Sequence, residues 1–181
     1  MNYRALLDAV AGRNIGARGD GIAEGMRQYF PQYSINSNLR IAHFVAQASH
    51  ETMGFRYLKE IWGPTPAQKR YEPPNKKAAD LGNDRPGDGR LYCGRGIFQL
   101  PGRGNYARIG KALALPLEVE PELACDPQIS VKIACHYWMT HGISAPADAD
   151  NVELVTRLIN GGLNGIEDRK ACLARAKEFL L

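Results

Sequence analysis

The chain has 181 residues, of which 44% are hydrophobic and 23% charged, a balance typical of a soluble globular protein. This composition excludes a disordered, collagen-like or coiled-coil chain, and the longest uncharged stretch, residues 133–147, is too short and too polar for a transmembrane helix. The net charge of +4 is too small and too scattered to indicate nucleic-acid binding, although it favours approach to an anionic surface.

The first part of the chain predicts three helices. Apolar residues at positions 5, 6, 9 and 10 predict a short helix, and a glycine-rich turn separates it from a second helix over residues 22–29. Either Asn36 or Asn38 can cap the third helix, and Gly54 predicts its C-terminal cap. The third helix carries apolar residues at core-facing spacing: Ile41, Phe44, Val45 and Ala48.

Residues 62–104 are rich in proline and glycine and predict a long irregular segment. We expect short strands near residues 90–92 and 97–99. Irregular stretches of this length in a compact domain are usually functional or disordered, and the interleaved aromatic residues and Cys93 favour function.

Helices resume after this segment. Tyr106, Ile109 and Leu113 share one helical face, Asp126 followed by a proline begins another helix, and Asn151 caps a third that ends at two glycines. A final helix is expected over residues 166–180. The sequence therefore predicts a mainly α fold, a single domain over residues 1–181 with a Pro/Gly-rich loop and short-strand insertion after the third helix.

Neither a metal site nor a cofactor motif is apparent, so we expect none. The four histidines lack metal-ligand spacing, and the four cysteines form no CxxC pair, which predicts reduced and mostly buried thiols. The N-terminus lacks a secretory signal pattern, so we expect synthesis and accumulation in the cytoplasm.

Glu51 is the most informative single residue. It follows Phe44 by seven positions, which places its side chain on the apolar face of the third helix and in its last turn. Burial and the helix dipole both favour the protonated form of a carboxyl group there, as a general acid requires. A helix-end glutamate that reaches water is the alternative.

Glu60 is the second candidate carboxylate. Gly54 interrupts the helix between the two glutamates, so the chain can turn and bring Glu60 across a cleft from Glu51. Two carboxylates in unequal environments across a groove are the minimal apparatus for hydrolysis of a glycosidic bond.

Three motifs accompany these glutamates in a characteristic order along the chain: residues 50–55 (HETMGF), 94–100 (GRGIFQL) and 159–165 (INGGLNG), followed by Arg169. With residues 62–68 (WGPTPAQ) and 81–89 (LGNDRPGDG), they resemble glycoside hydrolase family 19, the class I chitinases, and especially its short phage and bacterial members that act as endolysins. The resemblance covers about residues 39–180 and implies a mainly α, lysozyme-like α+β fold.

The resemblance also implies residue roles. Glu51 falls at the general acid and Glu60 at the general base of an inverting reaction, in which the carboxyl groups stand roughly 6.5–9.5 Å apart with a water between them. The positions implied to line the sugar groove or to hold the carboxylates are His50, Gln99, Asn105, Asn160 and Arg169. Amide side chains suit N-acetyl sugars, and the arginine suits a carboxylate held bidentately in its ionised form.

Pro101 departs from the family pattern. The family usually has Thr or Ser there, and its hydroxyl helps to hold the nucleophilic water, whereas proline has neither a hydroxyl nor a backbone N–H. Gln99, Thr52 or a backbone carbonyl is left to hold the water; otherwise activity is reduced or lost.

We therefore expect a lysozyme-like glycosidase that hydrolyses β-1,4 bonds between amino sugars of bacterial peptidoglycan. Alternatives are a chitinase, an exported wall-degrading toxin, a glycan-binding protein that has lost catalysis, and a lytic transglycosylase. The expected partners are peptidoglycan strands, without nucleic acid or stable membrane insertion. A monomer delivered to the cell wall or periplasm by a holin or a secretion machine fits this role.

Overall fold

The fold is mainly α, as the sequence predicts. The computed structural model describes all residues, 1–181. Its elements, in chain order, are α1 (Tyr3–Ala11), α2 (Gly16–Tyr29), η1 (Pro31–Tyr33), α3 (Asn38–Glu51), α4 (Pro66–Lys69), α5 (Lys76–Asp80), α6 (Asp88–Leu91), α7 (Arg103–Leu113), η2 (Pro121–Cys125), α8 (Pro127–Thr140), α9 (Ser144–Asp148), α10 (Val152–Asn160) and α11 (Ile166–Leu180).

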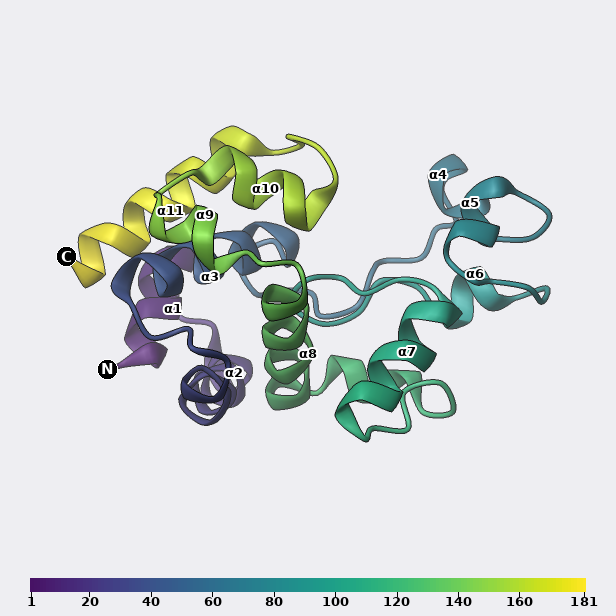
Figure 1. Cartoon of the computed structure of the whole chain (residues 1–181), viewed down its shortest axis with the longest axis horizontal. Coiled ribbons are helices and arrows are strands. Elements are labelled where there is room, and N and C mark those ends of the chain that lie inside the picture. The colour runs from purple at the N-terminus through teal and green to yellow at the C-terminus, as the bar shows by residue number, and fades with distance from the viewer.

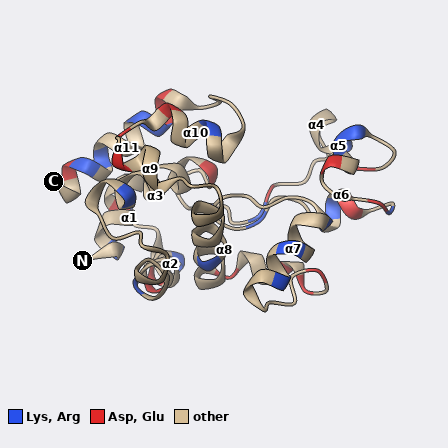
Figure 2. Ribbon diagram, viewed as in Figure 1, with Lys and Arg blue, Asp and Glu red and all other residues tan.

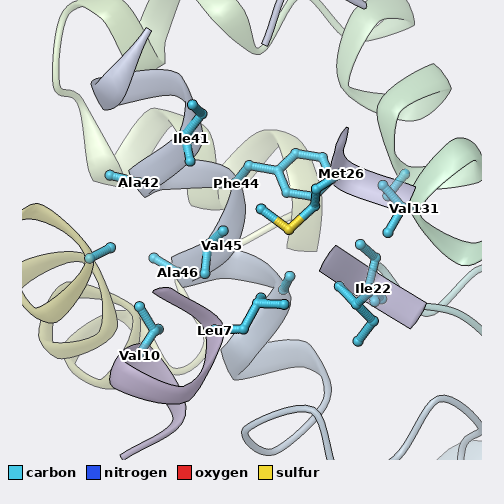
Figure 3. Packing of buried hydrophobic residues seen from close by; sticks show 14 of the residues in the cluster. Leu7, Val10, Ile22, Met26, Ile41, Ala42, Phe44, Val45, Ala46 and Val131 are labelled. Carbon is cyan, nitrogen blue, oxygen red and sulfur yellow. The ribbon is translucent and has the colours of Figure 1, made fainter. Parts of the chain in front are cut away.

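Helix α3 is the centre of the main hydrophobic core. All residues from Ile41 to Ser49 are buried, so this helix is covered on every side by α1, α9, α10 and α11. Phe44 contacts Trp138 of α8 and Phe30 at ring-centroid distances of 5.5 and 4.8 Å. Figure 3 shows Phe44 and Val45 of this helix among apolar side chains from α1, α2 and α8.

A second, smaller core lies on the other side of α8. Tyr92, Leu100, Tyr106 and Ile109 belong to it, and Ile133 contributes from α8 itself. Figure 1 shows α4, α5, α6 and α7 set apart from the helices around α3, with α8 between the two groups. Helix α8 therefore forms a wall that both cores share.

Two connecting segments join these groups of helices, and they pair with each other. Glu60 donates its backbone N–H to the Gly94 carbonyl at 2.8 Å, and Gly96 donates to the Leu58 carbonyl at 2.8 Å. Because backbone hydrogen bonds hold these segments together, the side chain of Glu60 is fixed relative to the loop that follows residue 94.

The short strands expected near residues 90–92 and 97–99 are wrong. Residues 88–91 form the helical turn α6, and only isolated bridges join Arg95 to Lys59 and to Leu100. The chain reverses between residues 95 and 100 because Gly96 and Gln99 have left-handed backbones, with φ of 79° and 49°. A turn therefore replaces the second expected strand.

The glycine-rich turn expected before residue 22 is also wrong, because α2 begins at Gly16. A methyl group at Gly21 would lie 2.7 Å from Pro127 Cβ, and one at Gly25 would lie 3.0 Å from Val131 Cβ. These glycines allow α2 and α8 to approach closely, and this packing outweighs the poor helix propensity of glycine.

Several caps follow the prediction. Asp126 accepts hydrogen bonds from two backbone N–H groups at the start of α8, Asn151 caps α10, and Gly161 ends α10 with a φ of 79°. The third helix differs, because Ser37 rather than either asparagine is its N-cap.

Two further features bear on the sequence expectations. All four cysteines are unpaired, and three of them are buried: Cys93, Cys135 and Cys172. No helix combines the length and the apolar character that crossing a membrane would require.

Candidate active site

A cleft of about 390 Å³ lies where the two cores meet. One wall consists of the end of α3, α8 and the end of α10, and the other consists of α5, α7 and the turn at residues 95–101. The polar and charged side chains that line it are Glu51, Tyr71, Lys77, Arg95, Gln99, Asn105, Arg108, Ser130, Tyr137 and Asn160.

Glu51 is the last residue of α3 and lines this cleft, as the helical periodicity predicts. Its side chain is 16% exposed, and its Oε1 accepts a hydrogen bond of 2.6 Å from Nη2 of Arg169. The contact is an ion pair through one guanidinium nitrogen. It sets the orientation of the carboxylate at the cleft wall.

Arg169 is itself held from behind by buried polar groups. Its Nη1 donates to Gln47 Oε1, its Nε donates to the Asn164 carbonyl at 3.1 Å, and Gln47 in turn donates to Thr156 Oγ1 at 3.0 Å. This chain links α3, α10 and α11 beneath Glu51. A fully satisfied buried network of this kind restricts its members to one arrangement.

Glu60 is held by a different set of donors. Its Oε1 accepts from Gln68 Nε2 and its Oε2 accepts from the Gly94 backbone N–H, both at 2.9 Å. The carboxylate is half-buried and lines a neighbouring pocket of about 430 Å³ that also includes Lys59 and Trp62. Both oxygens therefore have fixed hydrogen-bond partners.

Gln68 explains why the irregular segment after Glu60 is ordered. Its Oε1 accepts from the backbone N–H groups of Gly63 and Thr65, and its Nε2 also donates to the Ile61 carbonyl. Thr65 and Gln68 form a capping box at the start of α4. One glutamine thus joins a helix start to the Glu60 carboxylate.

Gln99 connects the Glu60 pocket to the cleft. A methyl group on Gly94 would lie 3.0 Å from Gln99 Oε1 and 3.3 Å from Glu60 Oε2, so both oxygens face the same small space beside Gly94. Gln99 Nε2 donates to the Gly96 carbonyl at 2.8 Å. Its amide oxygen is therefore turned toward Glu60.

Tyr71 lies at the same boundary. It lines the cleft, and burial together with the nearby charge of Glu60 raises the pKa of its hydroxyl. Tyr71 also packs against Trp62, with ring centroids 6.3 Å apart. These two aromatic side chains adjoin Glu60.

Pro101 lines the cleft directly after this turn, and its carbonyl accepts from Asn105 Nδ2 at 2.7 Å. Of the groups considered as replacements for the missing hydroxyl, Thr52 is excluded because its side chain is fully buried and bonded to the Ala48 carbonyl at 2.6 Å. Gln99 remains in a suitable position.

The remaining predicted residues divide into two groups. Asn105 and Asn160 line the cleft with Glu51. His50 does not line it: its Nδ1 lies 2.6 Å from Asp168 Oδ2, and its ring lies against Gly165, where a methyl group would overlap it. His50 therefore lies outside the residues that line this cleft, and its contacts join α3 to the start of α11.

Arg169 also differs from the sequence expectation. The family resemblance implied an arginine that holds a carboxylate in its ionised form, as a base requires, but the structure places Arg169 on Glu51 and not on Glu60. The contact is also through one nitrogen rather than two. The buried position of Arg169, between Gln47 and Asn164, decides which carboxylate it reaches.

Several polar side chains that line the cleft were not assigned to the site from the sequence, among them Tyr71, Lys77, Arg108 and Tyr137. The sequence did contain an indication for Arg108. It follows Asn105 by three positions on one helix, so the two side chains share a face, and that helix contains no acidic residue to pair with the arginine. Tyr71 and Lys77 lie in the Pro/Gly-rich segment, where periodicity gives no orientation.

The surroundings of Cys93 disfavour a role as nucleophile. It is buried beside Glu60, and burial raises the pKa of its thiol. A thiol must be ionised to attack, so these surroundings oppose that chemistry.

Comparisons with known proteins agree with this geometry. The family model described as "Chitinase class I" matches residues 32–157. A Haemophilus influenzae protein described as a glycosyl hydrolase family 19 domain-containing protein is 34% identical over 172 residues, covering 82% of this chain and 84% of that protein.

Endochitinase 2 of Gossypium hirsutum is 33% identical over 147 residues, covering 68% of this chain and 49% of that protein, so the chain spans about half the length of this plant relative. The crystal structure of chitinase C from Streptomyces griseus superposes with a TM-score of 0.74 at 24% identity, covering 99% of this chain and 76% of that chain, which shows the same fold. The chain therefore belongs to glycoside hydrolase family 19, the class I chitinase family, and is a chitinase-like glycosidase.

Proposed function

We propose that this glycosidase hydrolyses β-1,4 bonds between amino sugars of bacterial peptidoglycan by an inverting mechanism, with Glu51 as general acid and Glu60 as general base. The observation that carries the proposal is the Glu51 carboxylate, fixed at the cleft wall by a buried arginine. A proton donor must keep one orientation toward the glycosidic oxygen. The hydrogen bond from Arg169 to Glu51 Oε1 supplies this orientation, and Oε2 is left to carry the proton.

In the proposed reaction, Glu51 transfers its proton to the leaving glycosidic oxygen while Glu60 removes a proton from a water molecule. The water oxygen bonds to the anomeric carbon from the face opposite to the leaving group, so the configuration at that carbon inverts. Solvent then returns the proton to Glu51 and removes it from Glu60. No covalent sugar–enzyme intermediate is formed.

The proposed position for this water is the space beside Gly94, between Glu60 Oε2 and Gln99 Oε1. Both oxygens would lie within 3.3 Å of a methyl group built at Gly94, which supports a polar space of roughly that size. Gln99 thereby takes the role that the resemblance assigns to a hydroxyl at position 101. Because the water donates its two O–H groups to these two acceptors, its lone pairs are free to attack.

The charge of the cleft favours an anionic strand over a neutral one. Apart from Glu51, the ionised side chains that line the cleft are basic: Lys77, Arg108 and Arg95, the last of which is paired with Glu122. Figure 2 marks Lys or Arg on α5 and α7, the two helices of this wall. Peptidoglycan carries carboxylates on its lactyl groups and stem peptides, whereas chitin carries none.

The proposal extends to the setting of the reaction. We place the enzyme in the cytoplasm after synthesis and at the cell wall or periplasm when it acts, with a holin or a secretion machine for delivery. It would act as a monomeric single domain, because a long strand needs an open cleft. A role in phage lysis and a role as an antibacterial toxin share this chemistry.

Chitin hydrolysis is the second candidate function. It is favoured by the similarity to plant endochitinases over 68% of the chain. The two candidates differ in substrate and not in mechanism, so the discriminating property is the polymer that the enzyme cuts.

Digestion of two purified polymers tests the proposal. Outer-membrane-stripped peptidoglycan and chitin oligomers are incubated with the wild type and with Glu51→Gln, and soluble products are read by mass spectrometry and proton NMR. We expect hydrated muropeptides with α-configured new reducing ends from the wild type, and none from the variant. Cleavage of chitin alone, anhydro products, or binding without cleavage would each overturn the proposal.

A further inference from the structure

Arg108 is the guanidinium of the cleft that no carboxylate neutralises. It lies on α7 and lines both the cleft and a smaller pocket of about 280 Å³ that adjoins it. Its Nη2 donates to Asn105 Oδ1 at 2.6 Å, a neutral amide. The side chains that line the smaller pocket, Ile109, His136, Tyr137, Thr140 and His141, include no carboxylate.

Three other arginines around the cleft are each paired with an acid. Arg95 donates to Glu122 Oε1 at 2.6 Å, and Arg169 donates to Glu51 at the same distance. Arg103, five positions before Arg108 on the same helix, pairs with Asp88 at 2.6 Å. The exposed Arg108 differs from these three arginines in having no acidic partner.

The lining of the smaller pocket supplies no carboxylate to offset the charge of Arg108. Burial lowers the pKa of His136, and the charges of Arg108 and His141 lower it further. The His141 ring stacks on Tyr137, with ring centroids 3.7 Å apart. The guanidinium charge of Arg108, which no carboxylate of this pocket offsets, attracts an anion.

Arg108 is also close enough to the acid centre to act on the same strand. The pKa of the Tyr137 hydroxyl is raised by burial and by the charge of Glu51, and the charge of Arg108 opposes this rise. Tyr137 therefore lies within electrostatic reach of both groups. An extended glycan that contacts Glu51 and Tyr137 would pass Arg108.

We propose that Arg108, oriented by Asn105, binds a carboxylate that the glycan strand carries, so that the cleft selects anionic amino-sugar strands over neutral ones. This rests on the proposed function and names the group that the enzyme recognises. A guanidinium has five N–H donors, and the Asn105 contact leaves enough of them to hold a carboxylate through two hydrogen bonds.

The test varies the charge on both partners. Soluble peptidoglycan strands are compared with the same strands after their carboxylates have been converted to neutral amides with carbodiimide and methylamine. The measured quantity is the selectivity ratio, kcat/KM on native strands divided by kcat/KM on amidated strands. The variants are Arg108→Gln, which retains a polar side chain beside Asn105, and Lys111→Gln, which removes one charge from an exposed position of the same helix.

We expect a wild-type ratio of about two to five, the range for a charged pair near solvent, arising mainly from KM because the carboxylate is bound throughout the reaction. Arg108→Gln should bring the ratio close to one, and Lys111→Gln should keep the wild-type ratio. An unchanged ratio in Arg108→Gln, or equal falls in both variants, would overturn the inference.

Different results would contradict the carboxylate contact of Arg108 and the proposed hydrolysis of peptidoglycan. If the wild type cuts native strands with a ratio of one, the carboxylate contact is wrong and the proposed function stands. If the wild type cuts chitin oligomers and leaves native strands intact, the proposed function itself is wrong, and the inference fails with it.

Discussion

Arg169 Nη2 lies 2.6 Å from Glu51 Oε1, and the arginine side chain that makes this contact is only 1% exposed. The two residues are far apart in the chain, on α11 and α3, so the contact joins the C-terminal helix to the end of the helix that carries the proposed acid. The orientation of Glu51 therefore depends on the packing of both helices.

This contact predicts the effect of Arg169→Lys. A lysine keeps the charge but cannot reach Glu51, Gln47 and the Asn164 carbonyl together. We expect kcat to fall on the order of 100-fold with little change in KM, because a misplaced catalytic group costs about this much. Arg157→Lys on α10 is the control, since its side chain is exposed and pairs only with Glu153. A kcat for Arg169→Lys equal to that of the control would contradict the positioning role.

The proposed water position predicts that Gly94→Ala inactivates the enzyme. The added methyl group would lie 3.0 Å from Gln99 Oε1 and 3.3 Å from Glu60 Oε2, in the space assigned to the water. Gly94 is not among the residues with a positive φ, so its backbone accepts alanine. We expect kcat to fall by about two orders of magnitude or more, as for loss of one preorganised group.

The control for Gly94→Ala is Gly162→Ala, where the added methyl group would have no heavy atom within 4 Å. Thermal unfolding of both variants separates a blocked site from a damaged fold. Full activity of Gly94→Ala would show that the water is held elsewhere.

Gln68→Glu tests the role of Glu60 as a base. The substitution is isosteric, but it replaces the donor that lies 2.9 Å from Glu60 Oε1 with a carboxylate oxygen. Two carboxylates this close repel, so one of them keeps a proton to higher pH. We expect the acidic limb of the kcat/KM profile to move up by about one pH unit or more. The matched change at exposed Gln32 should leave the limb in place, and an unmoved limb in Gln68→Glu would argue against Glu60 as the base.

His43 predicts how stability depends on pH. The side chain is fully buried on α3, its Nε2 lies 2.9 Å from Asp150 Oδ1, and its Nδ1 has no partner. Burial lowers the pKa of His43, and the nearby charge of Lys177 acts in the same direction, while Asp150 opposes the shift. The unfolded chain therefore binds more protons than the folded chain just below pH 6.5.

It follows that the free energy of unfolding decreases as pH falls from about 6.5 to 5, with a slope of at most about 1.4 kcal/mol per unit from this one proton. Urea unfolding of the wild type and of His43→Gln at several pH values measures the slope. The variant should have the shallower slope whatever its absolute stability. Equal slopes would show that His43 does not couple protonation to folding.

The parts of the fold that the sequence predicted well depend on local chemistry. Asp126, Asn151 and Gly161 act as caps within a few residues of their own position, and the final helix was placed correctly. The start of α2 was missed because its glycines are favoured by contacts with Pro127 and Val131, more than 100 residues away. The turn at Gln99 was missed because a left-handed glutamine has no sequence signal.

In the candidate site, too, some features could be predicted from the sequence and others could not. Helical periodicity placed Glu51 on the core-facing side of α3, where the structure has it at the cleft wall. Which carboxylate Arg169 contacts could not be predicted, because it depends on how α11 packs on α3. His50 was assigned to the groove with its neighbour Glu51, but consecutive helix residues point about 100° apart, and the structure turns His50 toward Asp168.

The most direct test of the account is the release of soluble fragments from stripped peptidoglycan by three proteins: the wild type, Glu51→Gln and Glu60→Gln. Both substitutions keep side-chain volume, and thermal unfolding shows whether each variant is folded. The account predicts release by the wild type and a loss on the order of a thousandfold or more in each folded variant, because each lacks one partner of the proton transfer. Release by either folded variant at the wild-type rate would contradict the assignment of that glutamate.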